Sequence, residues 1–221
     1  LERRKEIRLT RHLRARDPAP SPDGASLVFV VNRLGKTRLA TMALLPERTA
    51  RAEDINWLTE ESDHQFENPR FSPDGQKIVV GVRQPEGHKD IWILDNRGNR
   101  IEALMHDRAI DGGAVWSADG SSIYFSSDRS GIFNLHVYDL ASKQIFQVSN
   151  VLGGAFMPSV TQDGSGIAFA NYSSRGFDIH FLDNKPAAWK AADSYRDPYP
   201  VMHYDEKAVS AEESSYNPLP T

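Results

Sequence analysis

The chain has 221 residues, of which 39% are hydrophobic and 25% charged, a composition typical of a soluble globular protein with an extensive core. The formal net charge of −4 gives no indication of a nucleic acid or an anionic membrane as partner. Because cysteine is absent, disulfides, thiolate metal sites and thiol nucleophiles are excluded.

The sequence carries no visible targeting signal. No apolar run approaches the roughly 20 residues of a membrane-spanning helix, so no direct membrane insertion is expected. The start of the chain, Leu1–Lys5, is charged and has neither an apolar stretch behind it nor an initiator methionine. We therefore expect a processed product or a piece of a longer protein.

The predicted elements begin with a short strand at Ile7–Thr10 that has no visible partner. The turn Ser21–Gly24 follows, then strands at Leu27–Val30, Leu39–Leu44 and Ile55–Thr59. In a Ser-Pro-Asp-Gly turn, proline pre-sets φ, aspartate bonds to nearby amides and glycine takes the positive φ. Because the turn lies between β-rich runs, it predicts a hairpin.

This order of turn and strands recurs three more times. The turn aspartates are separated by 51, 45 and 44 residues, and such a period is typical of one four-stranded β-propeller blade. The aspartates are Asp23, Asp74, Asp119 and Asp163. The later predicted strands are Asn68–Phe71, Ile78–Val80, Ile91–Asp95, Ile101–Leu104, Ala114–Trp116, Ile123–Phe125, Leu135–Asp139, Ile145–Ser149, Met157–Val160, Ile167–Phe169 and Ile179–Asp183.

The strand count ends unevenly, because the fourth module has no clear fourth strand after Asp183. Either residues 7–10 complete the last blade and close the ring, or the modules belong to a larger ring. We predict an all-β fold, a β-propeller with four recognisable four-stranded blades over residues 1–183. An open set of blades is expected to pair with another copy or to aggregate.

Residues 184–221 differ in character from the modules. They are rich in proline and aromatic residues, which predicts an extended tail, or a linker to a further domain, that packs on the propeller or on that domain. Within this tail, Ala187–Ala192 could form one helical turn.

The repeat of strand, Ser-Pro-Asp-Gly, strand and a strand ending in Leu-Asp resembles that of the TolB-like β-propeller family. Residues 5–183 carry the resemblance, most clearly Phe71–Gly75 and Trp116–Gly120. It implies a non-catalytic protein- or peptide-binding scaffold of the bacterial cell envelope, located in the periplasm. The namesake of the family binds peptidoglycan-associated lipoprotein, colicins and the Tol system.

The repeat is also similar to propellers of some prolyl-peptidase-type hydrolases. The alternative is therefore the propeller portion of a multidomain peptidase or hydrolase, gating or orienting substrate for a catalytic domain outside this chain.

Residue patterns that carry chemistry are scarce. Gly164–Gly166 has the wrong spacing for a nucleophile elbow and lies in a predicted hairpin. The seven histidines lack paired metal-ligand spacing, although His136 and His180 occupy equivalent strand positions. No nucleotide-binding glycine-rich loop is present. We therefore expect no catalytic residue, no metal and no cofactor.

One arginine recurs in the loop after each second strand, at intervals of 50, 46 and 46 residues. In a propeller these loops open on the face opposite the Asp-Gly turns, so the four would surround one channel mouth. They could hold a carboxylate or an acidic partner segment, or each could brace a neighbouring blade. These residues are Arg33, Arg83, Arg129 and Arg175.

The loops between consecutive blades open on the same face and add histidine, arginine and aromatic side chains. Such residues dominate protein-binding hot spots, so we predict that a protein or peptide binds there. The aromatic residues could instead plug the space between blades. The candidate residues are His64, Phe66, His106, Arg108 and Phe156.

Overall fold

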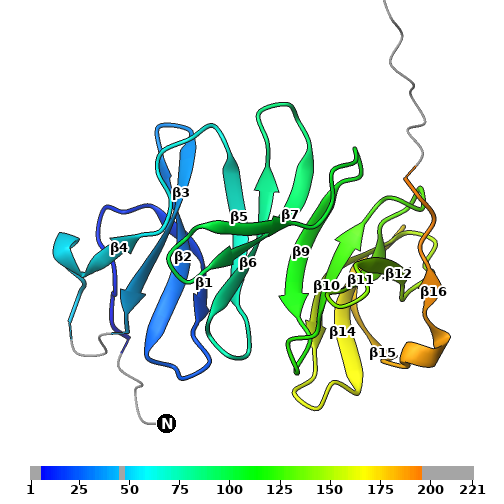
Figure 1. Cartoon of the computed structure of the whole chain (residues 1–221). Helices are drawn as coiled ribbons and strands as arrows, with labels where there is room; N and C mark the ends of the chain where they lie inside the picture. The colour runs from blue at the N-terminus through cyan, green and yellow to red at the C-terminus, as the bar shows by residue number, and fades with distance from the viewer. Residues whose placement is uncertain (1–5, 45–47, 196–221) are drawn as a thin grey trace, which may run out of the picture.

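The computed structural model describes residues 6–44 and 48–195 (Figure 1). Four antiparallel sheets are arranged as the blades of a β-propeller, which confirms the predicted fold class. Within each blade the strands pair in chain order. The strands are Ala15–Pro20 (β1), Ser26–Arg33 (β2), Lys36–Ala43 (β3) and Ile55–Trp57 (β4) in blade 1; Gln65–Phe71 (β5), Lys77–Arg83 (β6), Lys89–Asp95 (β7) and Arg100–Ala103 (β8) in blade 2; Asp111–Trp116 (β9), Ser122–Ser127 (β10), Asn134–Asp139 (β11) and Gln144–Gln147 (β12) in blade 3; Gly154–Val160 (β13), Gly166–Ser173 (β14) and Gly176–Asp183 (β15) in blade 4.

The Asp-Gly turns join strands one and two of every blade. In blade 2 the Ser72 hydroxyl donates to Asp74 Oδ1 at 2.5 Å, and the amide of Gln76 donates to the same oxygen at 3.0 Å. These bonds, the serine bond above all, lower the pKa of Asp74. Gly75 has a φ of +72°, which glycine adopts without steric cost. The local chemistry that predicts these turns from the sequence is therefore the chemistry that holds them.

A β-bulge interrupts the first strand of every blade, where the register with the second strand shifts. One residue near each bulge adopts a φ between 48° and 66°, six residues before the turn aspartate. Those residues meet between blades: the amide of Asn68 donates to Asp17 Oδ2 at 3.1 Å, and Met157 lies against Gly113. The bulges therefore bring the first strands of neighbouring blades together.

Three apolar cores lie between consecutive blades. Leu39 of blade 1 packs in a core with Val80 and Trp92 of blade 2, and Ile91 of blade 2 packs in the next core with Phe125 of blade 3. The third core contains residues of β10 and β11 together with β13 and β14. Each of these blades is thus stabilised by burying sheet faces against its neighbours.

The amino-terminal segment does not close the ring. Residues 7–10 form no strand; instead the amide of Ala50 donates to the carbonyl of Leu9 at 2.7 Å, and the Thr49 hydroxyl donates to the carbonyl of Arg8 at 2.8 Å. The hypothesis that this segment completes the last blade is wrong, because it lies against blade 1. Figure 1 shows its blue end at the side of the molecule away from the yellow strands of blade 4.

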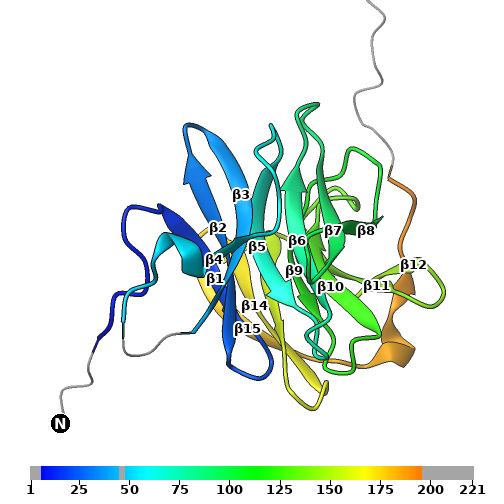
Figure 2. The ribbon, with the colours of Figure 1, turned by 60° about the vertical axis from the view of Figure 1, so that its left-hand side comes forward.

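The described part of the tail packs on the propeller. It contains a short 3-10 helix, Pro186–Ala188 (η2), and a strand, Lys190–Ala191 (β16), that pairs with β12 and adds a fifth strand to blade 3. The Trp189 ring lies 6.0 Å from the rings of both Tyr124 and Phe146. Figure 2 shows this orange segment running along the side of blade 3. The remaining tail, residues 196–221, lies outside the described residues.

We predict that Gly98→Ala destabilises the protein far more than Gly87→Ala. Both glycines have φ above +90°, so alanine costs about 1–2 kcal/mol in backbone strain at either position. At Gly98 the new Cβ would also lie 1.9 Å from the carbonyl oxygen of Leu58, whereas nothing lies within 4 Å at Gly87. Because Leu58 belongs to the first inter-blade core, an additional loss of about 2 kcal/mol or more is expected in urea unfolding. Equal losses in the two variants would contradict the predicted clash with Leu58.

Candidate partner-binding surface

The loops after the second strands lie at the end of the propeller opposite the Asp-Gly turns. Three of the four recurring arginines are exposed at this end: Arg33 and Arg83 are the last residues of β2 and β6, and Arg175 lies in the loop between β14 and β15. The side chain of Arg33 is 77% exposed and pairs loosely with Glu61 at 4.0 Å. These three guanidinium groups are therefore accessible to a partner from solvent.

Arg129 differs, because its side chain is only 4% exposed. Its Nη2 lies 3.2 Å from each carboxylate oxygen of Asp111, and its Nη1 lies 3.3 Å from Asp107 Oδ2. Asp111 begins β9, and Asp107 lies in the loop that leads from blade 2 into blade 3. Arg129 therefore joins the first strand of its own blade to the incoming loop.

Burial shifts the pKa values of Asp111 and of the nearby His136. Desolvation raises the pKa of Asp111 to about 6, although the neighbouring Arg129 opposes the shift. His136 is fully buried and stacks on Phe125 with 5.8 Å between the rings. Burial, and then the charge of Arg129, lower the pKa of His136 to about 4. Its Nδ1 lies 3.1 Å from the carbonyl oxygen of Asn134, whereas its Nε2 has no hydrogen-bond partner within the described residues.

The remaining candidate residues fall into buried and accessible groups. Phe66 is 3% exposed in the core between blades 1 and 2, so its ring is a plug and no part of the exposed surface. His64 is half-buried, with its ring 5.0 Å from that of Trp92. His106 and Arg108 are exposed on the loop between β8 and β9.

A pocket of about 250 Å³ lies beside these loops, where the first strands of blades 2, 3 and 4 converge. Phe156 is half-buried in its wall, 4.9 Å from the ring of Phe133. Lys89 and Glu67 form an ion pair of 2.5 Å at the opposite wall. The sequence analysis missed this pair and Met157, because the position six residues before each turn aspartate holds a different residue type in every blade. The pocket combines apolar walls with a charged pair, which suits a peptide segment.

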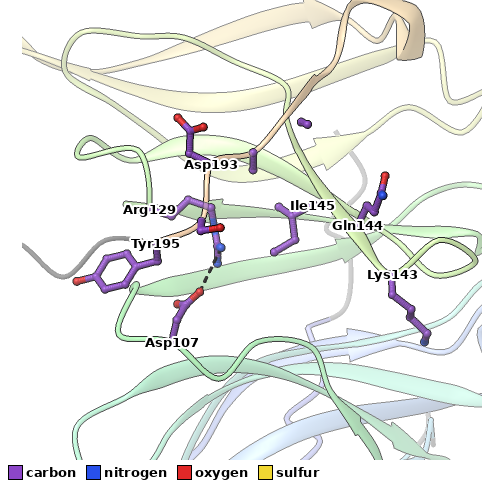
Figure 3. A pocket seen from close by; sticks show the side chains of 10 residues that line it. Asp107, Arg129, Lys143, Gln144, Ile145, Asp193 and Tyr195 are labelled. Atoms are coloured by element: carbon purple, nitrogen blue, oxygen red, sulfur yellow. Dashed lines mark hydrogen bonds and ion pairs between the residues drawn. The ribbon is translucent and has the colours of Figure 1, made fainter.

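A second cavity, of about 520 Å³, lies between blade 3 and the tail (Figure 3). Arg129, Asp107, Lys143 and Gln144 line it, together with residues 191–195 of the tail. In Figure 3 the guanidinium of Arg129 points at Asp107. The tail therefore forms one wall of a polar cavity beside the buried ion pair.

The serine of the Gly164–Gly166 segment, which was considered as a nucleophile, belongs to a turn. Ser165 donates to Asp163 Oδ1 at 2.8 Å within the fourth turn. Within residues 6–44 and 48–195, no three His, Asp or Glu side chains gather as metal ligands would. The same ranges contain no helix with the length and apolar character needed to cross a membrane.

Antiparallel sheets that pack face to face in chain order define a β-propeller domain. Residues 53–202 match the TolB beta propeller domain family, and the chain belongs to that family. The "Tol-Pal system protein TolB" of Francisella tularensis is 28% identical over 171 residues, which cover 75% of this chain and 37% of that protein. The protein of the same name from Anaeromyxobacter dehalogenans is 31% identical over 94 residues, covering 41% of this chain and 21% of that protein.

Solved structures give the same fold. TolB from Acinetobacter baumannii superposes with a TM-score of 0.66 at 20% identity, covering 76% of this chain and 41% of that one. A puromycin hydrolase superposes with a TM-score of 0.61 at 17% identity, covering 83% of this chain and 29% of that one. The chain thus spans less than half the length of each of these proteins.

We predict that Arg129→Gln and Arg175→Gln differ in effect although they change the same repeat position. Removing Arg129 leaves the buried Asp111 without its cation, which costs about 3–5 kcal/mol at neutral pH. Removing the exposed Arg175 changes stability by about 0.5 kcal/mol or less. Thermal and urea unfolding at pH 8 and pH 5 check this. The loss from Arg129→Gln is expected to be smaller at pH 5, because a protonated Asp111 needs no cation.

We predict that His136 lowers the stability of the folded protein in mild acid. As pH falls below 6.5, the unfolded chain takes up a proton on this imidazole, whereas the folded state does so only near pH 4. The contribution of His136 to the unfolding free energy therefore falls by up to about 3 kcal/mol between pH 7 and pH 4. The difference between wild type and His136→Gln, measured by urea unfolding at pH 7 and pH 5, is expected to shrink at pH 5. A difference independent of pH would contradict the burial argument.

Proposed function

We propose that the chain is a non-catalytic scaffold that binds a protein or peptide at the end bearing Arg33, Arg83 and Arg175. The observation that carries this proposal is the combination of exposed guanidinium groups with an adjoining apolar pocket. Guanidinium groups present forks of donors to carboxylates, and the pocket can receive an apolar side chain of the same partner. His106 and Arg108 extend the surface along the blade 2–blade 3 loop.

The relatives support a place in the bacterial cell envelope. Both are named as proteins of a Tol-Pal system, so a protein partner of that system is the first to consider. We infer a periplasmic location, and peptidoglycan-associated lipoprotein as the partner class. The proposed mechanism is geometric: rigid blades hold residues from all four modules at one end, and the partner binds without chemical change.

The test measures binding of the soluble part of peptidoglycan-associated lipoprotein, from the same organism, by calorimetry. The triple variant Arg33→Gln/Arg83→Gln/Arg175→Gln is expected to bind at least about tenfold more weakly and with less dependence on salt. Lys77→Gln/Arg97→Gln/Lys185→Gln, at the opposite end, serves as a control that loses the same charge. Absence of binding by the folded wild type, or equal affinities in the two triple variants, would overturn the proposal.

A second candidate is the propeller portion of a multidomain peptidase or hydrolase, favoured by the superposition on puromycin hydrolase. The same end of the propeller would then gate or orient substrate for a catalytic domain outside this chain. The complete reading frame separates the two functions. A neighbouring α/β domain with a Gly-x-Ser-x-Gly elbow favours the hydrolase, and its absence favours the scaffold.

A further inference from the structure

The Asp-Gly turns of neighbouring blades contact one another through proline at the first two junctions. A Cβ placed on Gly75 of the blade 2 turn would lie 3.7 Å from Pro22 Cδ of blade 1. A Cβ placed on Gly120 of the blade 3 turn would lie 3.5 Å from Pro73 Cδ of blade 2. At these van der Waals distances, the proline of each turn packs on the turn of the following blade.

The junction between blades 3 and 4 is built differently. Ala118 stands at the proline position in the turn of blade 3, and nothing among the described residues lies within 4 Å of a Cβ placed on Gly164. Tail residues Asn184, Pro186 and Trp189 line the space between these two turns, together with Ala118 and Gly164. At this junction the tail therefore lies where a turn proline makes the contact in the other two.

The side chain of Asn184 links the two blades directly. Its Nδ2 donates to the hydroxyl oxygen of Tyr124 in blade 3 at 2.8 Å and to the carbonyl oxygen of Gly164 in blade 4 at 2.9 Å. The backbone amide of Asn184 also donates to the carbonyl of Ser165 at 2.8 Å. Both hydrogens of one side-chain amide are thus used across the junction.

The following residues attach the same segment to the outer part of blade 3. The ring of Trp189 packs on those of Tyr124 and Phe146 and joins the core that blades 3 and 4 share. Next to it β16 pairs with β12, and the amide of Ala192 donates to the carbonyl of Ile145 at 2.9 Å. Residues 184–192 therefore run from the last described strand of blade 4 to the outer edge of blade 3.

Blade 3 differs from the other blades at the positions that hold this segment. Its second strand presents a tyrosine hydroxyl where the others have aliphatic side chains, and its outer strand presents an aromatic ring where blades 1 and 2 have polar side chains. The equivalent residues are Val28, Val79 and Ala168 for Tyr124, and Asn56 and Glu102 for Phe146. The sequence therefore specifies blade 3 as the place where the tail binds.

We propose that residues 184–192 form a clasp that holds blade 4 on blade 3 in place of the proline contact. The clasp continues directly from β15, so its attachment to blade 3 opposes separation of the two sheets. Because blade 4 contributes Phe156 to the pocket beside the exposed arginines, the clasp also keeps that wall of the pocket in position. This inference concerns contacts within the chain and does not depend on the proposed partner.

Hydrogen exchange of the full chain, followed by mass spectrometry, tests the clasp. Trp189→Ala removes the ring that packs on blade 3, so amide exchange in β13 and β14 is expected to become about tenfold faster, with β1 and β2 unchanged. Asn184→Ala is expected to have a smaller effect in the same region. Trp57→Ala is the matched control, because Trp57 is 40% exposed on the outer strand of blade 1, and it is expected to leave blade 4 unchanged. Circular dichroism checks that all three variants are folded.

A proline substitution tests whether the clasp replaces the turn contact. In the Trp189→Ala background, Ala118→Pro is expected to slow exchange in β13 and β14 by about threefold, because it restores the contact that Pro22 and Pro73 make at the other junctions. A slowing confined to β9 and β10, the hairpin that carries the new proline, would contradict this replacement.

Three outcomes of the exchange measurement would overturn the proposal. They are unchanged exchange in blade 4 after Trp189→Ala, a change confined to the tail and β12, and an equal acceleration in all four blades. The last result would mean that Trp189 stabilises the whole domain rather than the junction between blades 3 and 4.

Discussion

The burial of apolar sheet faces between consecutive blades is the constraint on which the rest of the structure depends. A single twisted sheet of four short strands has two faces, and water contacts both unless a neighbour covers them. Here Leu39, Ile91 and Leu135 at one repeated position are each removed from water by the following blade. At the same position in blade 4, Ile179 is exposed because no described blade follows it. The need to bury apolar faces also explains why the amino-terminal segment lies on blade 1.

The first strands of the stacked blades converge and form the pocket of the candidate binding surface. The bulge in each first strand holds one residue at positive φ. This residue lies next to its counterpart in the neighbouring blade, and Asn68, for example, is hydrogen-bonded to Asp17. The turn aspartate, six residues later, stabilises the hairpin, so the bulge and the turn are separated by the same number of residues in every blade. Because the strands converge there, Phe156 of blade 4 and the Lys89–Glu67 pair of blade 2 reach one pocket although they are distant in the sequence.

The sequence predicts the parts of this fold that depend on local chemistry. Each Asp-Gly turn is recognisable because its hydrogen bonds join residues two to five positions apart, and the strand alternation follows from the sheet pleat. The placement of residues 7–10 was not predictable in the same way, because their hydrogen-bond partners, Thr49 and Ala50, lie 41 residues further along the chain, after three intervening strands. Nor did Phe66 differ in the sequence from an exposed aromatic residue, since only the packing of two blades buries it.

The recurring arginine shows why a repeat position does not have one role. Arg129 and Arg175 follow equivalent strands, yet only Arg129 has buried carboxylates within reach, because Asp111 begins the adjacent strand and Asp107 enters from the preceding loop. In blade 4 the residue equivalent to Asp111 is Ala155, so the same side chain position offers no such partner there. A guanidinium remains exposed where no carboxylate is buried beside it, because desolvation without a counter-charge is unfavourable. The residue at this position of the first strand, Asp111 in blade 3 and Ala155 in blade 4, therefore decides whether the arginine braces its own blade or remains accessible to a partner.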